Sequence, residues 1–291
     1  MLVRFPKKFN RANFVEVSAR ITNIFKYGRI IWYAVLILPY VSNAQTSPTI
    51  RSPRPGQAFG PFTTGAKVFQ LQTGFNINSI DGPETEGNGF NYLASFRYSF
   101  TETFEVRSAF RLNSDKIITD GEETTLNGLS SWITGVRFNV LNNAGTSKAS
   151  LGFQVDANIN IFNNDFQLDH PAPRMIFLHG QRLSKWLSLV TNWGIAWNGF
   201  NGEPRGLYRV KFNIVTSSKI SVMVENYGNL IDGKFYTFFN TGPAWLITND
   251  LLLDLTLGFG RNRSIENLFV DFVFSWRTKP LGKIKEMPIN N

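Results

Sequence analysis

Hydrophobic and polar residues alternate one for one through most of this chain. In LFVDFVFSWR (268–277) large apolar side chains fill every even position, and Asp271 and Arg277 fall on odd ones. Successive side chains of a strand point to opposite faces, so the stretch predicts a strand with one apolar and one mixed, charged face. A buried carboxylate without a partner is costly, so Asp271 indicates that the second face is wet or paired.

The alternation recurs twelve times, and no segment of helical period competes with it. Two runs are weak: 173–183 alternates poorly, and 235–247 contains Pro243, which is unsuited to a paired strand. The predicted strands lie near 69–77, 92–100, 104–112, 132–140, 151–161, 173–183, 187–197, 208–214, 220–225, 235–247, 251–259 and 268–276.

Short and long links alternate between these strands. An even number of antiparallel strands with short turns at one end and long loops at the other is typical of transmembrane barrels. The short links are 101–103, 142–147, 184–185, 216–219 and 248–250, and the long ones are 79–89, 113–128, 163–173 and 198–206.

A soluble β-sandwich also alternates and is the main competing interpretation. Many of the runs span 9 to 12 residues, which suits the roughly 9–11 residues needed to cross a bilayer at a tilt, whereas globular strands average about five or six. Aromatic rings that suit the headgroup zone lie near strand ends: Trp132, Trp186, Trp197, Trp245, Trp276 and Tyr98. We therefore predict an all-β protein, a transmembrane up-and-down antiparallel β-barrel of about 12 strands surrounded by outer-membrane lipid.

Residues 1–44 have the pattern of a signal peptide for Sec-type export. Lys26 and Arg29 precede the apolar run 30–41, and small residues Ser42 and Ala44 favour cleavage before Gln45. An uncleaved anchor is the alternative. The long basic leader is unusual, which is consistent with a start codon chosen too far upstream.

Removal of this segment changes the charge of the chain. It holds seven of the 30 basic and one of the 21 acidic residues, which leaves a net charge of about +3 instead of +9. A nucleic-acid partner is therefore not expected. The chain has no cysteine, which excludes disulfides and Cys-ligated metals.

The remaining chain divides into three parts. Residues 45–64 are rich in Pro, Ser and Thr and show no period, so we expect an irregular segment that could plug the barrel. The barrel is expected at 65–278 and a C-terminal tail at 279–291. Twelve strands lie between filled eight-stranded barrels and porins of about sixteen, which favours a narrow or plugged lumen.

The parity of each strand assigns twelve charged residues to the lumen. They are Arg97, Glu105, Arg107, Arg111, Arg137, Asp156, Arg209, Lys211, Glu225, Asp254, Asp271 and Arg277. Seven are positive and five negative, which predicts a polar path with a weak preference for anions. For any single residue, pairing across neighbouring strands is the favoured interpretation.

Other candidate chemistry is sparse, and no catalytic residue, metal site or cofactor is predicted. His179 and Ser184 are poor evidence for a hydrolase, and His170 lies in a loop. The acidic loops 81–87 and 120–123 lack calcium-loop spacing and read as solvated charge.

Several hairpin-level motifs resemble those of the MetA-pathway phenol-degradation transporter family. They are RPGQAFGPFTTGAKVFQLQTGFN (54–76), YSFTETFEVR (98–107), LNGLSSWITGVRF (126–138), WLSLVTNWGIAWNG (186–199), LITNDLLLDLTLGFG (246–260) and FVFSWR (272–277). The resemblance implies an outer-membrane barrel of a Gram-negative bacterium, and some members are encoded beside aromatic-degradation genes. It implies no catalytic residues. Such barrels usually end at the aromatic residue of the last strand, whereas this chain continues with TKPLGKIKEMPINN. The expected partner is the barrel-assembly machinery, and the extension bears on how that machinery reads the C-terminus.

Together these observations predict a passive channel or transporter for small solutes, with hydrophobic or aromatic compounds among the candidates. A non-transporting barrel with a structural or adhesive role is the alternative, and an outer-membrane hydrolase is a more distant one.

Overall fold

The structure is a computed structural model that describes residues 47–52, 56–144, 146–162, 164–262 and 264–279. The predicted signal peptide (1–44) and nearly all of the predicted C-terminal tail lie outside the described residues. No helix in the described ranges is long and apolar enough to cross a membrane.

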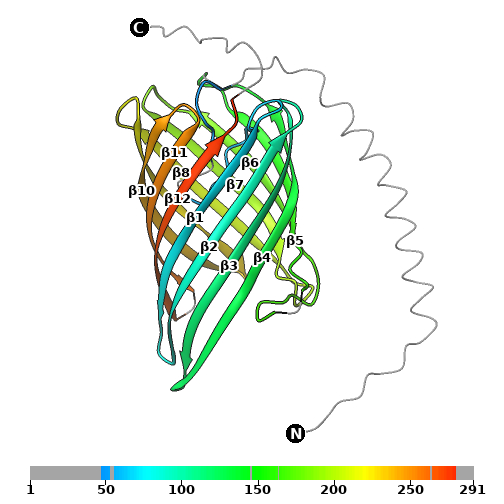
Figure 1. The fold of residues 1–291 in the computed structure, drawn as a ribbon, viewed down its shortest axis with the longest axis vertical. Coiled ribbons are helices and arrows are strands. Elements are labelled where there is room, and N and C mark those ends of the chain that lie inside the picture. The colour runs from blue at the N-terminus through cyan, green and yellow to red at the C-terminus, as the bar shows by residue number, and fades with distance from the viewer. Residues whose placement is uncertain (1–46, 53–55, 145, 163, 263, 280–291) are drawn as a thin grey trace, which may run out of the picture. The chain divides into compact units, whose positions relative to one another are not determined.

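Twelve antiparallel strands close into one barrel in which each strand pairs with its sequence neighbours and β1 pairs with β12. Figure 1 shows the tilted strands and the closure, with β1 (cyan) beside β12 (red). The predicted fold class is confirmed. The strands are β1 Phe69–Asp81, β2 Thr85–Ser99, β3 Phe104–Thr119, β4 Glu122–Leu141, β5 Ser150–Asn158, β6 Ala172–Arg182, β7 Leu187–Trp197, β8 Pro204–Val215, β9 Ile220–Ile231, β10 Lys234–Thr248, β11 Leu251–Asn262 and β12 Ile265–Arg277.

The two faces of the barrel wall have opposite polarity. The outer face is apolar: Phe259 is 60% exposed and Leu257 53%. Inward positions carry polar side chains, and Gln70, Asn192 and Thr256 are fully buried. A soluble sandwich would place its polar face outside. The reversed arrangement suits a wall between hydrocarbon and a polar interior.

The prediction of a long loop at 113–128 is wrong. β3 and β4 continue through it and meet at a two-residue turn, Asp120–Gly121, with φ of +54° and +82°. Asp-Gly with two positive φ values is a preferred hairpin turn because its twist matches that of the strands. The resulting hairpin projects beyond its neighbours at the lower end of Figure 1.

The other links differ less from expectation. The loop predicted at 79–89 shrinks to residues 82–84, while 159–171 and 198–203 remain longer connections. The weak runs are both strands. In β10 the pairing with β11 skips Gly242 and Pro243, so the missing N–H of Pro243 interrupts a ladder only on that side.

Candidate functional site

Residues 47–52 and 56–64, called here the inserted segment, contact the inner wall at several heights. The amide of Ile50 donates to the carbonyl of Asn249 in the short β10–β11 turn (2.7 Å). The amide of Gln57 donates to Glu225, midway along β9 (2.7 Å). The amide of Thr64 donates to Glu105 near the start of β3 (2.9 Å). The segment therefore enters at the short-turn end, reaches the middle of the barrel and returns to the start of β1.

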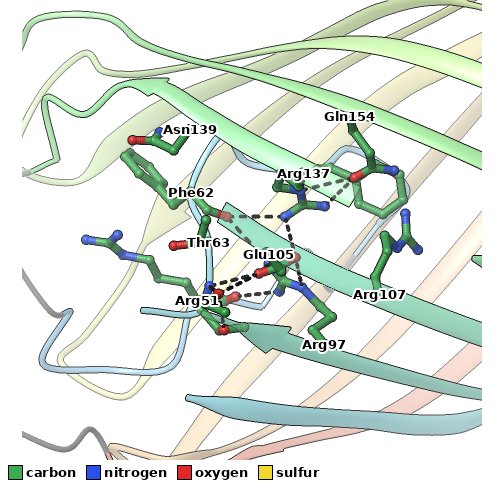
Figure 2. A network of polar contacts seen from close by, with 12 residues as sticks. Arg51, Phe62, Thr63, Arg97, Glu105, Arg107, Arg137, Asn139 and Gln154 are labelled. Atoms are coloured by element: carbon green, nitrogen blue, oxygen red, sulfur yellow. Dashed lines mark hydrogen bonds and ion pairs between the residues drawn. The ribbon is translucent and has the colours of Figure 1, made fainter. Parts of the chain in front are cut away.

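Glu105 joins the returning part of the segment to the wall. Its carboxylate accepts from Nε and Nη2 of Arg97 at 2.8 and 2.9 Å and lies 3.8 Å from Arg137. Arg137 also donates to the carbonyl of Phe62 at 3.2 Å. Figure 2 shows Arg97 and Arg137 beside Glu105, with the carbonyl of Phe62 next to Arg137. Burial of Glu105 is tolerable because the carboxylate has two cations and an amide as partners.

A second carboxylate lies deeper in the lumen. Asp156 of β5 accepts from Arg107 at 3.1 Å and from Nε and Nη2 of Arg174 at 2.8 Å each. Gln154 donates to Asp156 and accepts two bonds from Arg137, at 3.1 and 2.7 Å. The Glu105 and Asp156 clusters are therefore one continuous polar network along β2 to β6.

The tip of the inserted segment is held on the opposite wall. Both oxygens of Glu225 accept backbone amides, from Gln57 at 2.7 Å and from Ala58 at 2.5 Å. Lys211 donates to the carbonyl of Ala58 at 3.0 Å. Gly56 has φ of +93°, and an added Cβ would lie 2.7 Å from Glu225 Oε2, so the turn requires glycine.

The first residues of the segment are fixed at the barrel's short-turn end. Arg277, the last residue of β12, donates to Asp250 at 2.7 Å and to the carbonyls of Ser47 and Pro48 at 3.2 and 3.1 Å. The described part of the inserted segment makes no ladder with any strand. Mostly side chains of the wall hold it in place, together with isolated backbone contacts such as that of Ile50 with Asn249.

Two cavities flank the inserted segment. One, of about 300 Å³, is lined by the Gln57 tip and by polar side chains that include Asn76, Asn91, Arg111 and Asp271. The other, of about 440 Å³, lies on the short-turn side and is bounded by residues 49–52 and 60–62. The lumen therefore contains open space beside the tip of the inserted segment and beside its base.

The structure places the twelve sequence-predicted residues as follows. Arg111 and Asp271 line the first cavity, and Arg97, Arg137 and Lys211 line the second. Asp271 accepts from the side-chain amide of Asn76 at 2.8 Å, a cross-strand partner on β1. Glu105, Arg107, Asp156, Glu225, Asp254 and Arg277 are buried, Arg209 is half-buried, and only Arg111 is exposed.

Sequence reasoning missed residues that complete the network. Arg174 was missed because β6 alternates poorly: its inward positions include apolar Ile176 and Leu178, both fully buried. Asn192 lies on the inner face of β7, and its two bonds to the backbone of Phe59, both 2.8 Å, cannot be read from the alternation of the sequence.

The residues considered for hydrolysis do not form a catalytic pair. His179 lies on the outer parity of β6 and contacts Thr191 Oγ1 at 3.3 Å. Ser184 accepts the amides of Trp186 and Leu187 and shapes the β6–β7 turn. No group of three or more metal-ligating side chains occurs within the described ranges. Glu123 of the acidic β3–β4 hairpin forms an exposed ion pair with Lys116 at 2.8 Å.

Comparison with known proteins supports the fold. No protein-family model matches the chain, and no curated protein matches it. Among solved structures, an outer membrane channel from Pseudomonas putida F1 aligns with a TM-score of 0.58 and 12% identity, over 77% of this chain and 99% of that one. The transport unit of the autotransporter AIDA-I from Escherichia coli aligns at 0.49 and 10% identity, over 80% and 93%. The Pseudomonas putida toluene transporter TodX aligns at 0.45 and 7%, over 81% and 98%.

Proposed function

We propose that this protein is a passive channel for small solutes in the outer membrane of a Gram-negative bacterium, closed by its inserted segment. The observation that carries the proposal is the pair of cavities, about 300 and 440 Å³, that border the inserted segment, whose described residues form no ladder with the wall. A segment without strand pairing can leave the lumen while the barrel hydrogen bonds stay intact. The resemblance in fold to the Pseudomonas channel supports the same reading.

The orientation follows from the barrel's two ends. Short turns of such barrels face the periplasm, so the inserted segment enters from the periplasmic side and the cavity beside Asn76 and Asp271 opens toward the long hairpins. Residues 1–44 serve as the Sec-type signal peptide in this proposal, and residues 279–291 form a tail beyond the last strand.

The solute class is the finer part of the proposal. The motif resemblance to MetA-pathway phenol-degradation transporters favours hydrophobic or aromatic compounds. Purified protein in liposomes should release small entrapped solutes faster than protein-free liposomes. Absence of flux for every solute, also after deletion of the inserted segment, would favour the structural or adhesive alternative.

A further inference from the structure

Phe59, near the tip of the inserted segment, has its ring against an apolar patch of the inner wall. The patch consists of four buried side chains from three adjacent strands, β6 to β8: Ile176, Leu178, Ala196 and Leu207. Lipid cannot reach the inner face of a closed barrel, so this patch is not part of the membrane-facing surface. An aromatic ring is what it holds in this structure.

Four guanidinium groups surround the same ring. Their Cζ atoms lie 4.9 Å (Arg107), 5.4 Å (Arg137), 6.0 Å (Arg174) and 4.9 Å (Arg209) from the ring centroid. Significant cation–π contacts occur about once per 70–80 residues, so four on one ring exceed what packing alone produces. The four apolar and four arginine side chains together are called the Phe59 seat.

Two carboxylates, Asp156 and Glu105, lie within 4 Å of three of the four guanidinium groups of the seat. Asp156 is shared between Arg107 and Arg174, and Glu105 is closer to Arg97 (2.8 Å) than to Arg137 (3.8 Å). Arg209 forms no ion pair within 4 Å in the part of the chain that the structure describes, and its Nη1 is buried without a hydrogen-bond partner there. A buried, unsatisfied guanidinium N–H is a donor for an anion.

The ring of Phe59 can be replaced without disrupting the wall. Its backbone is held by two neutral hydrogen bonds to Asn192, which water can substitute. Its ring satisfies the apolar patch and the cation–π contacts but supplies no negative charge. Phe59 is therefore an incomplete ligand for its own seat.

We propose that the Phe59 seat is a binding site for single-ring aromatic carboxylates, which displace Phe59 on their way through the lumen. The ring of the solute takes the place of the Phe59 ring, and its carboxylate supplies the acceptor that Arg209 Nη1 lacks among the described residues. This proposal rests on the proposed channel function and deepens it by naming the solute class. A neutral aromatic offers only the ring, and an inorganic anion only the charge, so neither fills the seat.

Competition between the solute and Phe59 predicts how the affinity for the solute should change when the ring is removed. A solute that binds only when Phe59 is out has its apparent affinity reduced by the fraction of molecules in that state. Removal of the ring therefore tightens solute binding. A substitution that only damages the site would weaken it, so the direction of the change is diagnostic.

The test is calorimetric titration of the purified full-length barrel with benzoate. Phe59→Ala should tighten benzoate binding by about tenfold, and Arg209→Gln in the same background should reverse most of that gain. In Phe59→Ala, cyclohexanecarboxylate should bind several-fold more weakly than benzoate because it lacks the π-face, and benzyl alcohol should not bind measurably. The probe series needs only the Phe59→Ala protein, so it remains decisive if Arg209→Gln does not fold.

Three outcomes would overturn the proposal: unchanged or weaker benzoate binding in Phe59→Ala, equal binding of benzoate and benzyl alcohol, or benzoate binding that is displaced by an equal concentration of chloride. Conductance in planar bilayers with chloride salts separates this failure from failure of the channel function. A protein that conducts chloride but binds no benzoate keeps the channel and loses the seat, whereas a protein that conducts nothing with the inserted segment deleted loses the channel.

Discussion

Arg97 and Arg107 are direct cross-strand partners on β2 and β3, and each resolves the like-charge contact by binding a different carboxylate. Arg97 binds Glu105 at 2.8 and 2.9 Å, and Arg107 binds Asp156 at 3.1 Å. Like charges directly opposite each other destabilise a sheet. The two carboxylates therefore stabilise the wall, and Glu105 at the same time fixes the amide of Thr64 in the inserted segment.

The substitution Glu105→Gln should release the inserted segment. It leaves Arg97 and Arg137 without their shared carboxylate, and breaking a buried pair costs about 3–5 kcal/mol. We expect that cost to fall largely on the inserted conformation, because a barrel opened to water can hydrate both guanidinium groups. Single-channel recordings should show a raised open probability, and added protease should cleave residues 47–64 faster.

The matched control for this change is Glu123→Gln. Glu123 pairs with Lys116 at the same 2.8 Å, but both side chains are about half exposed, at 52% and 53%. Exposed pairs contribute about 0–1 kcal/mol, so this variant should behave like the unmodified protein. Equal effects of the two substitutions would show that burial of Glu105 is irrelevant to closure.

Deletion of residues 45–64 should raise conductance and shift selectivity toward anions. The deletion joins the two cavities and removes the carbonyls that now accept from Arg97, Arg137, Lys211 and Arg277. These cations then face a water-filled path, and charges that line a pore set its selectivity. Reversal potentials in a salt gradient measure the shift. Unchanged conductance would mean that the segment does not close the barrel.

A new charge should destabilise the barrel strongly on the outer face of the wall and only slightly on the inner face. Leu257, in the middle of β11, is 53% exposed on the outer face, and Leu257→Lys should destabilise the barrel by about 2–4 kcal/mol. Leu93 lines the first cavity, and Leu93→Lys should cost little because water reaches it. Urea unfolding in lipid bilayers gives both free energies. Comparable losses would contradict the assignment of hydrocarbon to one face and water to the other.

The strands were predictable because one physical rule, opposite solvents on two faces, acts on every residue of the wall. The rule fails where the inner face of a strand is apolar instead of polar. β6 was weakest because Ile176 and Leu178 are apolar on the inner face, where Phe59 covers them, and Arg174 was lost with it. The loop predicted at 113–128 failed for a different reason: polar residues such as Asn113 and Asp115 continue a strand whose inner face is solvated.

The contacts of the inserted segment could not be predicted, since an aperiodic segment gives no register. The sequence indicates that Glu105 and Glu225 face inward but not that backbone amides of residues 57, 58 and 64 reach them. Gly56 and Pro61 are signals of irregular backbone only. Which wall residues these amides contact depends on how far the inserted segment runs into the lumen before it turns. That depth is set by contacts with the wall, which the sequence of the segment does not reveal.

A reversible tether at the base of the inserted segment should keep the channel closed for longer. The hydroxyl oxygens of Ser52 and Ser275 lie 3.1 Å apart, so the side chains at these two positions face each other and are candidates for a disulfide. The chain has no cysteine of its own, so Ser52→Cys with Ser275→Cys introduces a single possible pair. When oxidised, the bond fixes residue 52 to β12, while residue 68 leads directly into β1, so the chain between them is held at both ends and returns to the lumen more readily. Oxidation should shorten the openings seen in recordings of the unmodified protein, and a reductant added during the recording should restore them within the same membrane. Either single substitution alone controls for the loss of one hydroxyl and should gate normally in both redox states. If the openings of the oxidised pair last as long as those of the reduced one, the inserted segment is not the gate.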